Sequence, residues 1–177
     1  MKKVALIVSA IIIALILSAC STNDKLEDVG LDGLTGKEIL TGIADGSIVV
    51  DGFGISVYDD ELVVILDKDR VSVDMPDDEF YVSVAPYIDI THECLFHSAT
   101  GCRGELKTEQ FFIEFIDIDG NVIISENMTS MSNGFIDLWL PRNIEGTLTI
   151  SHNELSASKV ISTVAGEPTC ETTMKLT

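Results

Sequence analysis

The sequence has few basic side chains. Its 177 residues include 11 Lys and Arg against 29 Asp and Glu, which gives a formal net charge of −18. Two of the basic residues, Lys2 and Lys3, lie at the amino terminus, so the rest of the chain is more acidic still. Because such a surface repels polyphosphate at moderate ionic strength, the composition excludes nucleic acid as a partner.

The sequence also lacks the short motifs that are typical of common enzymes. It contains no Gly-x-Ser-x-Gly turn, no phosphate-binding loop and no Cys-x-x-Cys pair. Asp and Glu are too abundant for any pair of carboxylates to stand out. We therefore expect a protein that is not an enzyme, with no catalytic residues and no residues that bind an organic cofactor.

An apolar run lies near the amino terminus. Val4–Leu17 follows two lysines and is shorter than the about 20 residues that a membrane-spanning helix needs. A charged start, a short apolar stretch and small residues before Cys20 are typical of a secretory signal peptide. Because Leu17-Ser18-Ala19-Cys20 resembles a bacterial lipobox, we expect residues 1–19 to be a lipoprotein signal peptide and Cys20 to carry the lipid. This pattern predicts an exported protein, lipid-anchored at the bacterial cell envelope and facing outside the cytoplasm.

The rest of the chain predicts a mostly β protein. Residues 20–34 are polar and acidic, as in a tether or linker, and Thr35-Gly36-Lys37-Glu38 has the pattern of a helix capping box. Further on, apolar residues recur with the period of strands, and Asp119-Gly120 predicts a hairpin. Strands are expected near residues 55–57, 62–66, 71–73, 80–84, 111–116, 122–124, 135–140, 148–150 and 158–164. We expect an α+β fold with an N-terminal subdomain over 35–85 (a short helix plus strands) and a sandwich-like domain of antiparallel sheets over 86–177.

Cysteine and histidine are scarce and unevenly distributed. Two of the three histidines, His92 and His97, lie within the same eleven positions as Cys94 and Cys102. Thiolates select Cu(I), zinc or iron–sulfur clusters, and imidazole suits copper and zinc. The segment therefore suggests a site for a soft metal ion.

A disulfide is the alternative use of these thiols. In an exported protein, a structural β module with a Cys94–Cys102 disulfide would be ordinary. An exported thiol–disulfide redox protein is a further alternative, although the seven residues between the two cysteines are too many for a CxxC motif. Cys170 leaves one thiol unpaired whichever bond forms, and the flanking imidazoles add nothing to a structural bridge. These observations favour a metal site.

Three separated motifs carry a resemblance to a known family. They are THEC-x-x-HS-x-x-x-CRGE (residues 91–105), NGFI-x-LWLPR (residues 133–142) and PTCETT (residues 168–173). In this order they resemble the CueP family of exported copper-binding proteins. The resemblance implies that three cysteines, Cys94, Cys102 and Cys170, are the copper ligands. It also implies a role in holding periplasmic copper, in copper resistance and in supplying a copper-dependent superoxide dismutase or another cuproenzyme. The lipobox is a departure, because the best-known members are soluble periplasmic proteins.

Three thiolates favour Cu(I) over Zn(II). A trigonal set of sulfurs satisfies the d¹⁰ Cu(I) ion, whereas zinc usually takes a fourth ligand. His92 and His97 are expected as auxiliary ligands or as groups that orient the ligands, and His92 is the better placed because it shares a face with Cys94 in an extended segment. Among the methionines, Met174 is the soft donor nearest in sequence to Cys170.

Overall fold

The structure is a computed structural model that describes residues 25–177. The expected signal peptide, the lipidation site Cys20 and the first part of the expected linker lie outside the described residues. No helix within residues 25–177 is both long enough and apolar enough to cross a membrane.

The predicted fold class is confirmed. The described residues form mostly β structure, arranged mainly in antiparallel sheets, with a short N-terminal helix. The elements are α2 (Gly36–Asp45), β1 (Gly54–Val57), β2 (Glu61–Leu66), β3 (Asp69–Asp74), β4 (Glu79–Val84), β5 (Gln110–Asp117), β6 (Val122–Thr129), β7 (Ile136–Pro141), β8 (Glu145–His152), β9 (Leu155–Ser162) and β10 (Cys170–Glu171).

The helix begins as its sequence predicts. The amide of Glu38 donates to the Thr35 hydroxyl (3.3 Å), and the Glu38 carboxylate accepts from the Thr35 amide (2.8 Å), which completes the capping box. Gly46 ends the helix in the left-handed conformation (φ 81°), which glycine adopts without a steric penalty. Ile39 and Leu40 are buried against the three-stranded antiparallel sheet β1-β2-β3.

The segment before the helix is packed on the protein. Leu26 and Leu31 are buried in the same apolar cluster as Ile39 and Leu40. Residues 25–34 therefore differ from the expected linker, because these two leucines remove apolar surface from water in an otherwise polar stretch.

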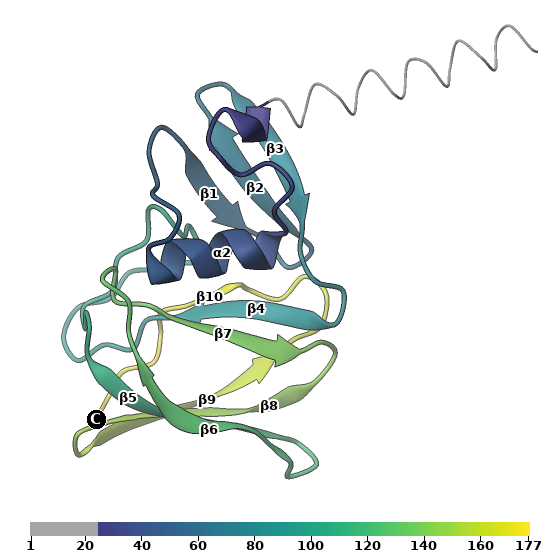
Figure 1. Cartoon of the computed structure of the whole chain (residues 1–177). Coiled ribbons are helices and arrows are strands. Elements are labelled where there is room, and N and C mark those ends of the chain that lie inside the picture. Colours follow the sequence, from purple (N-terminus) through teal and green to yellow (C-terminus); the bar gives the residue numbers. More distant parts are fainter. Residues whose placement is uncertain (1–24) are drawn as a thin grey trace, which may run out of the picture.

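A central layer joins the two halves of the molecule. In this layer β4 pairs antiparallel with β7 and parallel with β10 (Figure 1). Phe80 and Val82 contribute to the core shared with the four-stranded sheet, whereas Tyr81 contributes to the core beneath α2 and the N-terminal sheet. The expected boundary near Ala85 therefore divides this layer, because β4 belongs with β7 rather than with β1–β3.

The outer layer is a four-stranded antiparallel sheet in the order β6-β5-β8-β9. The predicted hairpin at Asp119-Gly120 is confirmed: it connects β5 to β6, and Gly120 has a φ of 86°. The inward side chains of β5 and β8 fill the core between this sheet and the central layer; they include Phe111, Ile113, Phe115, Leu148 and Ile150.

A long connection, residues 85–109, leads from β4 to β5 and contains the candidate metal-binding residues. Its last part passes very close to the loop before β7. The Gly104 amide donates to the Asn133 carbonyl (2.6 Å), and a Cβ on Gly104 would lie 2.5 Å from the Gly134 carbonyl oxygen. The two backbones can approach this closely because neither glycine has a side chain.

We predict that Gly104→Ala lowers the free energy of unfolding by about 2 kcal/mol, because the new methyl group must displace backbone atoms. Gly54→Ala is the matched control, since its Cβ would meet nothing closer than 3.7 Å. Urea titration of both variants checks the prediction. Equal stability of the two variants would contradict it.

Candidate metal centre

Three cysteines from distant parts of the sequence lie together. Cys94 and Cys170, 76 residues apart, form a disulfide, with a Cα–Cα distance of 5.7 Å. The sulfur of Cys102, the free thiol within the described residues, lies 3.6 Å from that of Cys94. The disulfide considered from the sequence, Cys94–Cys102, is therefore wrong in its pairing.

The short strand β10 explains this pairing. Its residue Cys170 lies beside Ser83 of β4 in a parallel register. The amides of Ser83 and Ala85 donate to the carbonyls of Thr169 (2.9 Å) and Glu171 (2.8 Å). Because the loop that holds Cys94 continues directly from β4, this pairing brings Cys170 to the base of the loop.

His97 forms the buried side of the cluster. Its side chain is 0% exposed, its ring packs against Phe135 (4.7 Å between centroids), and Nδ1 lies 3.8 Å from the Cys170 sulfur. The Nε2 atom has no hydrogen-bond partner within residues 25–177. Burial, and secondly the charge of nearby His92, lower the pKa of His97 to about 3. The imidazole is therefore neutral at physiological pH, with a nitrogen lone pair available for a metal ion.

Thr169 fixes the backbone of His97. The His97 amide donates to the Thr169 hydroxyl (3.0 Å), which in turn donates to the Val57 carbonyl (2.6 Å). The Val57 amide donates to the His97 carbonyl (2.7 Å). Strand β1, the cysteine-rich loop and the segment before β10 are thus joined at one buried hydroxyl.

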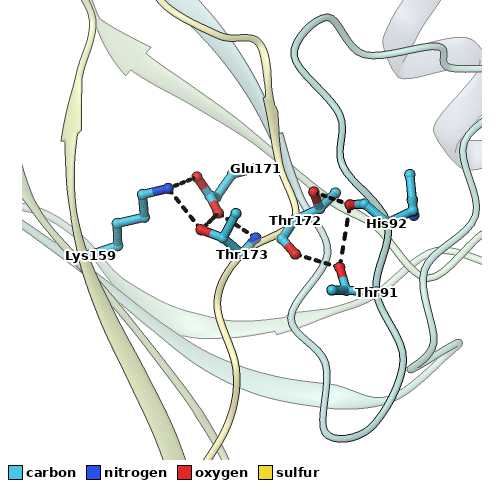
Figure 2. A network of polar contacts seen from close by, with 6 residues as sticks. All are labelled: Thr91, His92, Lys159, Glu171, Thr172 and Thr173. Atoms are coloured by element: carbon cyan, nitrogen blue, oxygen red, sulfur yellow. Dashed lines mark hydrogen bonds and ion pairs between the residues drawn. The ribbon is translucent and has the colours of Figure 1, made fainter.

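His92 forms the exposed side of the cluster. Its ligand atom lies within 4.8 Å of the sulfurs of Cys94 and Cys102, and its side chain is exposed. The backbone at His92 is held by hydroxyls: Thr172 donates to the His92 carbonyl (2.6 Å), and Thr91 donates to the Thr172 carbonyl (Figure 2). Figure 2 also shows the His92 side chain pointing away from Thr172.

Side-chain contacts also stabilise the chain at the end of β10, on both sides of Thr172. Lys159 of β9 forms an ion pair with the Glu171 carboxylate (2.6 Å), which also accepts from the Thr173 amide (2.6 Å), as Figure 2 shows. These side chains hold the chain on both sides of Thr172. Glu171 and Thr173 belong to the PTCETT motif, whereas no sequence motif indicated Lys159.

Glu105 holds the start of the cysteine-rich loop. Its carboxylate accepts from the amides of Ile88 (2.8 Å), Asp89 (3.0 Å) and Ile90 (3.2 Å). These donors, that of Ile88 first, hold the pKa of Glu105 below its ordinary value. Glu105 is the last residue of the first motif, but nothing in the sequence indicated that its carboxylate accepts from three backbone amides.

A cleft with a volume of about 370 Å³ adjoins the buried side of the cluster. His97, Arg103, Met131 and Asp137 are among the residues that line it. Met131 also packs against the apolar cluster that includes the cysteines. Met174, the soft donor nearest in sequence to Cys170, is buried in the core between the central and outer layers.

The donor set suits a soft cation. Two overlapping groups have their ligand atoms within 4.8 Å of one another: one is His92, Cys94 and Cys102, and the other is His97, Cys102 and Cys170. Thiolate and imidazole are ligands that copper and zinc prefer. With the disulfide formed, two of the three sulfurs cannot act as thiolates, so the full donor set exists in the reduced protein.

Comparison with known proteins identifies the family. The sequence profile of the family described as "Periplasmic copper-binding protein CueP" matches residues 48–175. The chain belongs to the CueP family. A solved structure described as "Crystal Structure of S.CueP" is 36% identical to this CueP-family chain, with a TM-score of 0.81 over 88% of this chain and 96% of that chain. A comparison with curated proteins found no match.

Family membership confirms the resemblance inferred from the three motifs. CueP is a family of periplasmic copper-binding proteins, which supports export of this chain and copper as its metal. The roles of the individual cysteines and histidines stay predictions.

We predict that Glu105→Gln lowers the free energy of unfolding by about 1 kcal/mol at pH 7, because an amide oxygen accepts three hydrogen bonds less well than a carboxylate. The lowered pKa means that this stabilisation is present above the unfolded-state pKa of about 4 and is lost as the pH falls through the lower folded-state pKa. Urea titrations at pH 7 and pH 3 check this.

Glu126→Gln, at an exposed position on β6, is the control for Glu105→Gln. A difference between wild type and Glu105→Gln that stays constant from pH 7 to pH 3 would contradict the assigned role of the carboxylate.

Proposed function

We propose that this chain is a lipid-anchored extracytoplasmic protein that binds Cu(I) through the sulfurs of Cys94, Cys102 and Cys170. The observation that carries the proposal is that these sulfurs, from residues up to 76 positions apart, meet beside two imidazoles. Membership of a family of periplasmic copper-binding proteins supports the choice of metal. The protein acts in copper sequestration and tolerance, or in delivery of copper to a cuproenzyme such as a copper-dependent superoxide dismutase.

The preference for Cu(I) over Zn(II) rests on the three sulfurs and on the family. Three sulfurs complete a trigonal Cu(I) site, and the buried His97 imidazole, whose Nδ1 lies 3.8 Å from the Cys170 sulfur, is the kind of donor that can join them. Zinc would need four ligands in a tetrahedron. Either imidazole could complete such a tetrahedron with the sulfurs, so membership of a copper-binding family is what favours copper here.

Copper binding requires the reduced protein. A dithiol reductant supplies two electrons and two protons, which break the Cys94–Cys170 bond and yield two thiols beside that of Cys102. Each thiol that coordinates the ion then releases its proton. The disulfide form would hold copper weakly, because a single thiol remains.

The lipid anchor rests on the sequence alone. Acylation at Cys20, with two or more chains, would give stable attachment to a membrane. The polar residues between Cys20 and Leu26 would then separate the packed domain from the membrane surface.

A thiol–disulfide redox protein is the second candidate function. The thiol of Cys102 lies 3.6 Å from the Cys94 sulfur, close enough to attack it, form a Cys94–Cys102 bond and release the Cys170 thiolate. Helix α2 begins at Gly36 and none of the three cysteines lies at its start, so the chain lacks the arrangement in which the helix of a CxxC oxidoreductase activates its thiol. Turnover of a disulfide substrate with a dithiol reductant distinguishes this function from copper binding.

We predict that the reduced protein binds one Cu(I) per chain and prefers it to Zn(II). Cys94→Ser, Cys102→Ser and Cys170→Ser should each weaken Cu(I) binding by more than about tenfold while the domain stays folded, because each removes one sulfur from the site. Titration of reduced protein against a competing Cu(I) chelator, with circular dichroism as the folding check, measures both properties.

Met174→Leu is the matched control, because it removes a sulfur from the core without touching the site. Full Cu(I) affinity in any one of the serine variants would remove that cysteine from the proposed site. Tighter binding of Zn(II) than of Cu(I) by the reduced wild-type protein would contradict the choice of metal.

A further inference from the structure

The two histidines lie on opposite sides of the three sulfurs, in very different surroundings. The His92 side chain is exposed and belongs with Cys94 and Cys102. The His97 side chain is 0% exposed and belongs with Cys102 and Cys170, of which Cys170 is 3% exposed. Solvent exposure of the side chains therefore decreases across the cluster. His92 is exposed, Cys94 and Cys102 are half-buried, and His97 and Cys170 are buried.

Resting on the Cu(I) site proposed above, we infer that copper is captured on one side of the cluster and held on the other. The capture group is His92, Cys94 and Cys102. The holding group is His97, Cys102 and Cys170. His92 then sets the rate at which copper enters and leaves, and His97 sets how long it stays.

The holding group has the properties of a closed site. The His97 ring packs against the rings of Phe135 and Tyr81, with centroid separations of 4.7 Å and 6.0 Å. Hydrogen bonds at the His97 amide and the His97 carbonyl fix its backbone. Its Nε2 lacks a partner within the described residues, while Nδ1 faces the Cys170 sulfur. Coordination through Nδ1, the nitrogen that faces Cys170, would add an imidazole bond to an ion held by that sulfur.

The capture group has the properties of an open site. Thr172 holds the His92 backbone, which fixes the position from which the imidazole extends. The ring itself is exposed and can reach an ion that other ligands still bind. An incoming Cu(I) complex would meet His92 and the half-exposed sulfurs of Cys94 and Cys102 before it could reach Cys170.

The shared sulfur allows the ion to move without being released. The Ser98 amide donates to the Cys102 sulfur (3.3 Å), which fixes that sulfur between the two groups. During the shift, the copper–His92 bond breaks and bonds to Cys170 and His97 form, which completes the three-sulfur site. The Cys102–copper bond persists, and the oxidation state of the ion does not change.

The test measures Cu(I) exchange between the reduced mature protein and the chelator bicinchoninate by stopped-flow absorbance. His92→Ala should slow transfer in both directions by about tenfold while leaving the equilibrium affinity close to that of wild type. His97→Gln should speed release by about tenfold and weaken the affinity by the same factor, with an unchanged rate of capture. His152→Ala is the matched control, because this third histidine lies on the β8–β9 hairpin and contacts the Gln110 carbonyl (2.9 Å). It should change neither property.

Two results would overturn the inference: exchange rates in His92→Ala equal to those in His152→Ala, or equal losses of affinity in the His92 and His97 variants. If His97→Gln does not fold, nitrogen NMR of the wild-type imidazoles decides. Cu(I) loading should shift the ring nitrogens of His97 and leave those of His152 unchanged, and an unshifted His97 would contradict the holding role. Failure of the wild-type protein to bind Cu(I) is a separate result, which would refute the proposed function itself.

Discussion

The parallel pairing of β10 with β4 is the constraint on which the candidate site depends. The strand has two residues, yet its backbone hydrogen bonds to Ser83 and Ala85 bring Cys170 from near the carboxyl end to the cysteine-rich loop. The partner of β10, strand β4, is buried on both faces and pairs with β7 on its other edge. One of the three sulfurs is therefore fixed by the core, and the other two are carried by a loop.

Polar contacts, rather than regular structure, shape that loop. Residues 85–109 contain no strand of their own, but Glu105 holds the loop's start and Thr169 holds it at His97. These groups anchor the backbone and leave the ring of His92 and, in the reduced protein, the three sulfurs free to act as ligands. A site of this kind is preorganised on one side and accessible on the other, which suits a protein that must both retain a metal ion and exchange it.

Sequence reasoning reached the fold class, the helix and most strands, because capping and periodicity are local signals. It also selected the three cysteines, through motifs and a family resemblance. It missed the partner of Cys94, because two residues of parallel strand carry no periodicity and the pairing is decided by tertiary structure. Likewise, nothing local shows that Leu26 and Leu31 are packed, that β4 lies between two cores, or that His97 rather than His92 is buried.

The central claim is that three sulfurs distant in sequence serve one copper ion. Copper K-edge X-ray absorption of the reduced, Cu(I)-loaded protein tests it most directly, because it reports which elements surround the metal. The account predicts a first shell dominated by sulfur, with nitrogen as a minor component, and the sulfur contribution should fall in Cys170→Ser. A shell of nitrogen and oxygen, or one unchanged by loss of the Cys170 sulfur, would contradict it.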